Sequence, residues 1–113
     1  MHEVGIMEGA INMALKLMSE QNGSRLRAIH MTVGSLSSVV PQALDSAFLS
    51  LRASYGIDTA ELHITWVEAT CFCTDCQCEF SFDQFGYICP HCHEPAFNVS
   101  KGKELELTRV EWE

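Results

Sequence analysis

The sequence predicts an α+β protein in which a small mixed β-sheet with two helices carries an inserted, cysteine-rich ribbon. Apolar residues recur at helical spacing in two segments, and a strand-like segment follows each of them. All six cysteines of the 113-residue chain fall between positions 71 and 92, and a further strand-like segment comes after them. We therefore expect residues 1–69 and 99–113 to form one domain and residues 70–98 to form a second.

The first helix is predicted over residues 3–21, with Met13 and Leu17 among its core positions, and it stops at Asn22-Gly23. A strand follows over residues 25–34. The second helix begins at Pro41, where the missing N–H costs nothing, and ends at Gly56. A second strand over residues 61–69 completes a strand–helix–strand unit, which is typical of a right-handed crossover.

The last strand is predicted over residues 103–112. The apolar residues move from odd to even positions along the strand, which indicates a bulge or a change of face near Thr108. The ribbon therefore interrupts the main sheet, and we expect a two-chain hinge near residues 69–71 and 98–102. Within the ribbon, the twelve residues 77–88 are expected to form a short β-hairpin.

Two C-x-x-C pairs define the ribbon: Cys73 with Cys76, and Cys89 with Cys92. Each pair can wrap its backbone around one side of a metal ion, and four thiolates at one centre make a closed structural zinc site. Iron in a rubredoxin-like site is the main inorganic competitor. Cys71 and Cys78 flank the first pair and leave the choice of ligands slightly open.

Composition argues against several classes of protein. Three disulfides in a secreted domain are disfavoured because the first residues, MHEVGIMEGA, do not resemble a signal peptide. The formal net charge is −8 with seven Lys and Arg, and zinc-bound thiolates would bring it to about −10, which opposes nucleic-acid binding. No run approaches the roughly 20 apolar residues of a membrane span. We expect a soluble, cytoplasmic protein.

The N-terminus offers a second candidate metal site. The α-amine of Met1, the amide nitrogen and imidazole of His2, and the amide of Glu3 can supply a plane of four nitrogens. Such a plane suits Ni²⁺ or Cu²⁺, because deprotonated amides are strong donors. Taken alone, an early histidine is more typical of an exposed, frayed chain end.

The combination of motifs is more specific. An MHE start, a C-x-C-x-x-C followed by C-P-x-C-H, and the closing GKELELTRVE resemble the HypA/HybF family of hydrogenase nickel-incorporation proteins. The resemblance implies a nickel metallochaperone for the nickel–iron centre of hydrogenase and, in some organisms, for urease. By position, Met1, His2 and Glu3 would hold the transported Ni²⁺, and Cys73, Cys76, Cys89 and Cys92 the structural Zn²⁺.

The resemblance also implies partners: a maturation GTPase like HypB, the hydrogenase large subunit and, where urease is the client, urease maturation proteins. We find no nucleophile–base pair or phosphate-binding loop in the sequence, so an enzyme is not expected. The main alternative function is a zinc-ribbon scaffold or interaction protein without a nickel role. Two lobes joined by a short hinge leave room for a domain-swapped homodimer.

Four more histidines need an interpretation. His91 and His93 lie in or beside the second cysteine pair, and either one is a candidate modulator that replaces a thiolate on acidification or nickel loading. The simpler interpretation is that both are surface residues of a loop. His30 and His63 lie on predicted strands, where we expect packed or exposed side chains rather than ligands.

Overall fold

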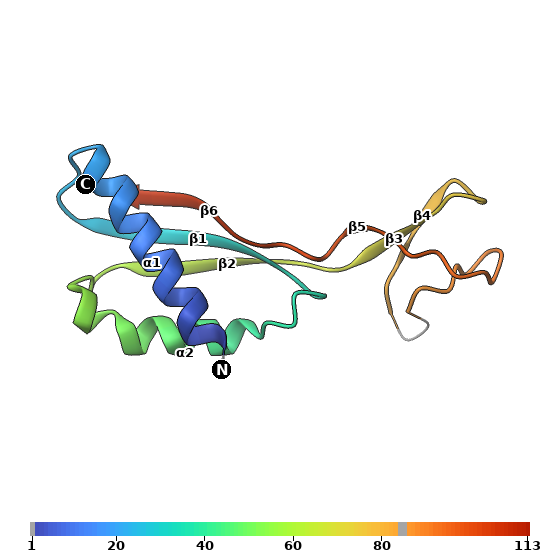
Figure 1. Cartoon of the computed structure of the whole chain (residues 1–113), viewed down its shortest axis with the longest axis horizontal. Helices are drawn as coiled ribbons and strands as arrows, with labels where there is room; N and C mark the ends of the chain where they lie inside the picture. The colour runs from blue at the N-terminus through green and yellow to red at the C-terminus, as the bar shows by residue number, and fades with distance from the viewer. Residues whose placement is uncertain (1, 84–85) are drawn as a thin grey trace.

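The computed structural model describes residues 2–83 and 86–113. Within these residues, two helices, one short 3-10 helix and six strands follow along the chain. They are α1 (His2–Glu20), β1 (Leu26–Gly34), α2 (Pro41–Leu51), η1 (Ala53–Tyr55), β2 (Glu61–Val67), β3 (Thr70–Cys73), β4 (Cys78–Ser81), β5 (Asn98–Lys101) and β6 (Leu105–Trp112). The strands form two separate three-stranded sheets. Figure 1 shows them at opposite ends of an elongated molecule.

The main sheet has the order β2-β1-β6, with β1 in the middle. β1 pairs parallel with β2 and antiparallel with β6, so the sheet is mixed, as predicted. One face of β1 contributes Ile29, Met31 and Val33 to a core that both helices cover. The α+β class with two helices on a small mixed sheet is therefore confirmed.

The buried face of α1 differs from the prediction at Met13 and at Leu17, which is 37% exposed. Its fully buried residues are Met7, Ala10, Ile11 and Ala14, whereas Met13, predicted to lie in the core, is 48% exposed. The helix is apolar over most of its circumference, so spacing alone does not decide which stripe meets the sheet. The predictions for Met13 and Leu17 were wrong for this reason.

The second helix is shorter than predicted. Pro41 occupies its first turn as expected, but α2 ends at Leu51. The short η1 continues the chain to Gly56, whose φ of 70° lies in the left-handed region that glycine accepts without strain. Arg52 donates a hydrogen bond from its guanidinium to the carbonyl of Ala60, at 3.1 Å. This contact ties the helix end to the residue that precedes β2.

The bulge near Thr108 is confirmed. His30 pairs with Arg109 and the next residue, Met31, pairs with Leu107, so Thr108 is the extra residue on β6. The Thr108 hydroxyl donates to the carbonyl of His30, at 3.2 Å. The bulge restores Leu107 and Val110 to the same side, where both pack against the core.

The second sheet has the order β4-β3-β5 and belongs to the cysteine-rich ribbon. β3 and β4 pair antiparallel around the first C-x-x-C pair, with Cys73 directly opposite Cys78. The hairpin therefore encloses the first cysteine pair, and the prediction of a hairpin between the two pairs was wrong. In the described part of residues 77–88, only β4 is a strand, and one isolated bridge joins Ile88 to Pro95.

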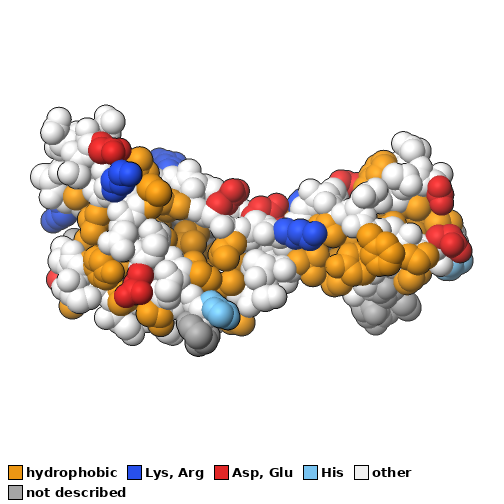
Figure 2. Space-filling view, viewed as in Figure 1, with side chains coloured by type: hydrophobic (Ala, Val, Ile, Leu, Met, Phe, Trp, Pro, Cys, Tyr) orange, Lys and Arg blue, Asp and Glu red, His pale blue; other side chains and the backbone are white. Residues whose placement is uncertain are grey.

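A narrow neck joins the two sheets (Figure 2). Three chain segments meet there, because the loop after β1 lies against both connections between the sheets. Gly34 donates its amide to the carbonyl of Glu104, and Leu36 donates to Gly102, both at 2.7 Å. Ser35 accepts the amide hydrogen of Ala69 on its hydroxyl oxygen at 2.9 Å. The predicted two-chain hinge is thus a neck that a third segment braces.

Glu113 forms pH-dependent ion pairs with Arg25 and Arg27 at the start of β1. The hydrogen bonds from Arg25 and then Arg27 hold the pKa of its carboxyl below the ordinary 4.5. We expect Glu113→Gln to lower the melting temperature at neutral pH, because the two arginines lose their ionised partner. Because the pKa of Glu113 is lower in the folded than in the unfolded protein, its ionised carboxylate stabilises the fold at pH values above 4.5. The difference in melting temperature between wild type and Glu113→Gln should therefore vanish as the pH falls below 4.5 through the folded-state pKa.

Thermal unfolding from about pH 7 to about pH 3 would measure this effect. The matched control is Glu106→Gln, an exposed carboxylate on β6. A difference between wild type and Glu113→Gln that persists at the acid end would assign the effect to something other than the ion pairs.

Candidate metal centre

The structure brings four cysteines together at the far end of the ribbon. The sulfur atoms of Cys73, Cys76, Cys89 and Cys92 all lie within 4.8 Å of one another. Cys73 and Cys89 are buried, while Cys76 and Cys92 are partly exposed. Cys71 and Cys78, which the sequence left as alternative ligands, are not members of this group. Among the described residues, no other set of three or more potential ligands is as close.

The spacing of the four sulfurs fits a tetrahedral metal ion. The Cys73–Cys92 sulfur distance is 3.7 Å and the Cys76–Cys89 distance is 3.9 Å. A zinc–sulfur bond of about 2.3 Å in a tetrahedron requires sulfurs about 3.8 Å apart. All six cysteines are free thiols, and these distances greatly exceed a disulfide bond of about 2.05 Å. The arrangement suits a closed four-thiolate centre.

Two backbone turns of the same kind hold the cysteines. The residue after each pair has positive φ: Gln77 at 55° and His93 at 64°. In the second turn, His93 donates its amide to the carbonyl of Cys89 at 2.9 Å. The left-handed conformation favours glycine or asparagine, and neither residue stands at these positions, although Pro90 after Cys89 indicates a tight turn at the second pair. The matching conformation after both pairs indicates two equivalent metal knuckles.

The protonation of the thiols depends on their neighbours. Backbone hydrogen bonds, first from the amide of Cys92, lower the pKa of Cys89 to about 6. A side-chain hydrogen bond with Cys92 raises the pKa of Cys76. Without a metal ion, the crowded sulfurs therefore share protons unequally. Outside the group, burial raises the pKa of the Cys71 thiol. The thiol therefore stays protonated and neutral, which suits a side chain packed in the ribbon core.

His91 and His93, the candidate modulators, are exposed side chains of the second knuckle. Neither belongs to the four-ligand group in this structure. Their proposed exchange with a thiolate remains a prediction.

The candidate nickel ligands lie in the other lobe, at the start of α1. Met1 lies outside the described residues. His2 is the first residue of the helix and is exposed, and Glu3 is half-buried in the first turn. The first four amides of a helix have no acceptor within the helix. The amide nitrogens of His2 and Glu3 therefore lie outside the helix hydrogen-bond ladder, where a metal would displace no helical bond.

Comparison with known proteins decides the family. The family model described as hydrogenase/urease nickel incorporation, metallochaperone, hypA matches residues 1–112. The chain belongs to the HypA family. A hydrogenase maturation factor HypA of Picosynechococcus sp. is 34% identical over 111 residues, which cover 98% of each chain. The factor of Chloroflexus aggregans is 32% identical over 112 residues, again covering 98% of each chain.

Solved structures confirm the HypA fold. The solution structure of the nickel metallochaperone HypA from Helicobacter pylori superposes with a TM-score of 0.67 at 21% identity, covering 99% of this chain and 97% of that one. A second HypA solution structure gives a TM-score of 0.70 at 22% identity, covering 99% and 96%. In residues 2–83 and 86–113, no helix has the length and apolar character needed to cross a bilayer. The family is one of nickel metallochaperones, as the motifs indicated.

Proposed function

We propose that this protein binds Ni²⁺ at Met1, His2 and Glu3 and delivers it during maturation of [NiFe]-hydrogenase or of urease. The family match, which includes the N-terminal residues, carries the proposal. The exposed His2 side chain at the start of α1 and the two amides outside the helix ladder support the ligand set.

The charge balance also favours an amide-bound nickel at this position. The N-terminal end of a helix carries a partial positive charge, which opposes a bare divalent cation. Two deprotonated amides contribute two negative charges, so the nickel site as a whole adds no net charge to the helix end. Protonation of the amides or of the imidazole would dismantle the site stepwise, which suits transfer rather than storage.

Zinc in this proposal is a resident structural ion, bound by Cys73, Cys76, Cys89 and Cys92. Four thiolates close its coordination and leave no open position for a reacting molecule. The protein then acts as a carrier and not as an enzyme, working in the cytoplasm. A HypB-like GTPase would supply the energy-coupled step, and the hydrogenase large subunit or a urease maturation protein would receive the ion.

A nickel titration of zinc-loaded protein with a native N-terminus tests the proposal. Calorimetry and d–d absorption should show one planar-type Ni²⁺ site per chain, which His2→Ala abolishes because the imidazole closes the chelate. A protein with two residues added before Met1 keeps His2 but displaces the amine, and should also lose the planar spectrum. His91→Ala, an exposed histidine of the ribbon, is the matched control.

Identical planar spectra in wild type and His2→Ala would reject the N-terminal site. The protein would then be better described as a zinc-ribbon scaffold within the maturation pathway.

A further inference from the structure

Two histidines lie side by side on the main sheet, away from both the cysteines and the N-terminus. His30 on β1 is the direct register partner of His63 on β2. Their rings stack with centroids 4.8 Å apart and planes inclined by 20°. The neighbouring residues Ile29 and Met31 are in the helix-covered core, so strand alternation places His30 on the open face of the sheet.

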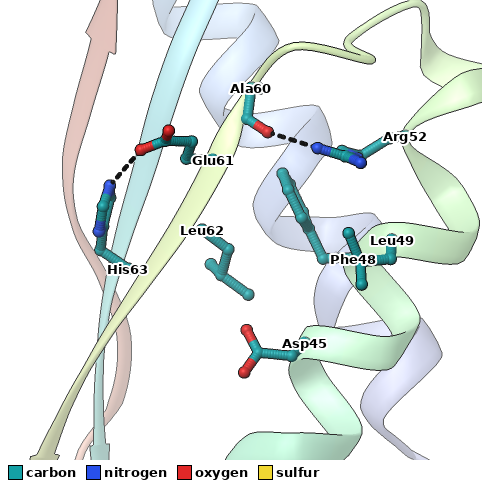
Figure 3. Close-up of a pocket in the computed structure, with 8 residues that line it drawn as sticks. All are labelled: Asp45, Phe48, Leu49, Arg52, Ala60, Glu61, Leu62 and His63. Atoms are coloured by element: carbon teal, nitrogen blue, oxygen red, sulfur yellow. Dashed lines mark hydrogen bonds and ion pairs between the residues drawn. The ribbon is translucent and has the colours of Figure 1, made fainter.

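Each imidazole already has a carboxylate partner. The Nε2 atom of His30 lies 2.5 Å from Glu111 on β6, and Nε2 of His63 lies 3.1 Å from Glu61 on β2. Figure 3 shows Glu61 and His63 together on one side of β2, with Phe48 and Leu49 of α2 on the other. The hydrogen bond with His30 lowers the pKa of Glu111, which therefore stays ionised at neutral pH.

The cluster draws on all three strands and borders a small polar hollow of about 160 Å³, lined by Arg27, Ala28, Thr59, Glu61, His63 and Glu111. Two imidazoles and two carboxylates are donors that suit Ni²⁺ and Zn²⁺. Neighbouring ligands on a six-coordinate ion with bonds of about 2.1 Å lie about 3 Å apart. The His63–Glu61 separation of 3.1 Å matches this spacing, and the His30–Glu111 separation of 2.5 Å would have to lengthen.

We propose that His30, His63, Glu61 and Glu111 form a second, open binding site for a divalent transition-metal ion, Ni²⁺ or Zn²⁺, on the exposed face of the sheet. The site is independent of the proposed nickel site at the N-terminus and of the cysteine centre. Its four donors come from residues that the strand register aligns across β2, β1 and β6.

Binding requires the two His–Glu pairs to converge, because their ligand atoms do not yet meet within 4.8 Å as those of the cysteines do. The outer pair has the freedom to move: the side chains of His63 and Glu61 are 51% and 70% exposed. The inner pair is more confined, with His30 at 28%. We therefore assign His30 and Glu111 as the anchored half of the site and His63 and Glu61 as the half that closes.

Of the two nearby arginines, one competes with a metal ion for a proposed ligand and so lowers the expected affinity of the site. Arg27 is paired with Glu113, but Arg109 has its Nε 3.8 Å from the Glu111 carboxylate and competes with a cation for it. A metal ion must displace or outweigh this contact. The site should accordingly bind more weakly than the four cysteines, and removal of the Arg109 charge should strengthen it.

The test uses zinc-loaded, full-length protein carrying His2→Ala, which removes the proposed N-terminal site. Ni²⁺ titration followed by calorimetry and by NMR should show one further ion per chain. An N,O-ligated, six-coordinate Ni²⁺ is paramagnetic, so amide signals around His30 and His63 should broaden selectively. Adding His63→Gln should weaken binding about tenfold or more, and adding Arg109→Gln should tighten it.

Glu106→Gln in the same background, an exposed carboxylate on β6, is the matched control and should leave the second ion bound. Glu61→Gln is a second ligand variant should His63→Gln disturb the fold, which circular dichroism and zinc content would reveal. Absence of nickel binding in the His2→Ala protein would overturn the proposal, as would binding unchanged by His63→Gln. Neither result bears on the N-terminal site, which the comparison of wild type with His2→Ala tests separately.

Discussion

Replacing Cys89 with serine should release the zinc and unfold the ribbon while the main sheet stays folded. Among the described residues, the ribbon core consists of five buried ones, of which Cys71, Cys73 and Cys89 are cysteines. So small a cluster cannot offset the conformational entropy of ordering the ribbon. Binding of structural zinc contributes about 10–16 kcal/mol in comparable small modules, so its loss should remove nearly all protection there.

Amide hydrogen exchange with zinc analysis would measure this effect. Residues 70–101 should exchange freely in Cys89→Ser, whereas β1 should remain protected because none of the ribbon residues that the structure describes belongs to the main core. Cys78→Ser is the matched control, since Cys78 lies outside the ligand group, and it should retain zinc. Zinc lost from Cys78→Ser but kept in Cys89→Ser would reverse the ligand assignment.

The second large effect is expected at the neck, from Gly102→Ala. Gly102 has a φ of 117°, which L-residues rarely adopt, and an added Cβ would lie 2.4 Å from the Cα of Ala69. The Cβ would also lie 3.0 Å from the backbone nitrogen of Ala69, and no side-chain rotation relieves contacts with backbone atoms. Combined strain and overlap should destabilise the protein by about 3 kcal/mol, as measured by denaturant unfolding.

Gly9→Ala provides the opposite control. Gly9 is exposed in the middle of α1, and an added Cβ would meet nothing within 4 Å. Alanine there should stabilise by about 0.5–1 kcal/mol. Equal stability of Gly102→Ala and wild type would show that the three segments at the neck can separate without cost.

Periodicity and turn residues were sufficient to predict the main lobe. Both helices, the three strands of the main sheet and the bulge at Thr108 follow from local pattern. The sequence could not assign Met13, because a helix with apolar residues on most sides can present several stripes to a sheet. Nor could it end α2 at Leu51, since the contact from Arg52 to Ala60 is a tertiary one.

The candidate sites were predictable to different degrees. The spacing of the cysteine pairs favours the four cysteines that the structure groups, whereas Cys71 and Cys78 kept the choice of ligands slightly open until their distance from that group was known. The first of the turns that position them was not predictable, because glutamine at position 77 does not favour positive φ. The alignment of His30 with His63 depends on the register of two strands distant in sequence, which no local pattern encodes.

Because three segments brace the neck, a force on one end of the molecule would be transmitted to the other end. The chain extends 55 Å along its longest axis and only 16 Å along its shortest, and the four cysteines lie at one end. If a docked protein displaced the ribbon, the hydrogen bond between Ala69 and Ser35 would transmit that displacement to the loop that leads to α2. Because α2 packs against α1, whose first residues include His2, a protein docked at the cysteine end would also displace the end that carries His2.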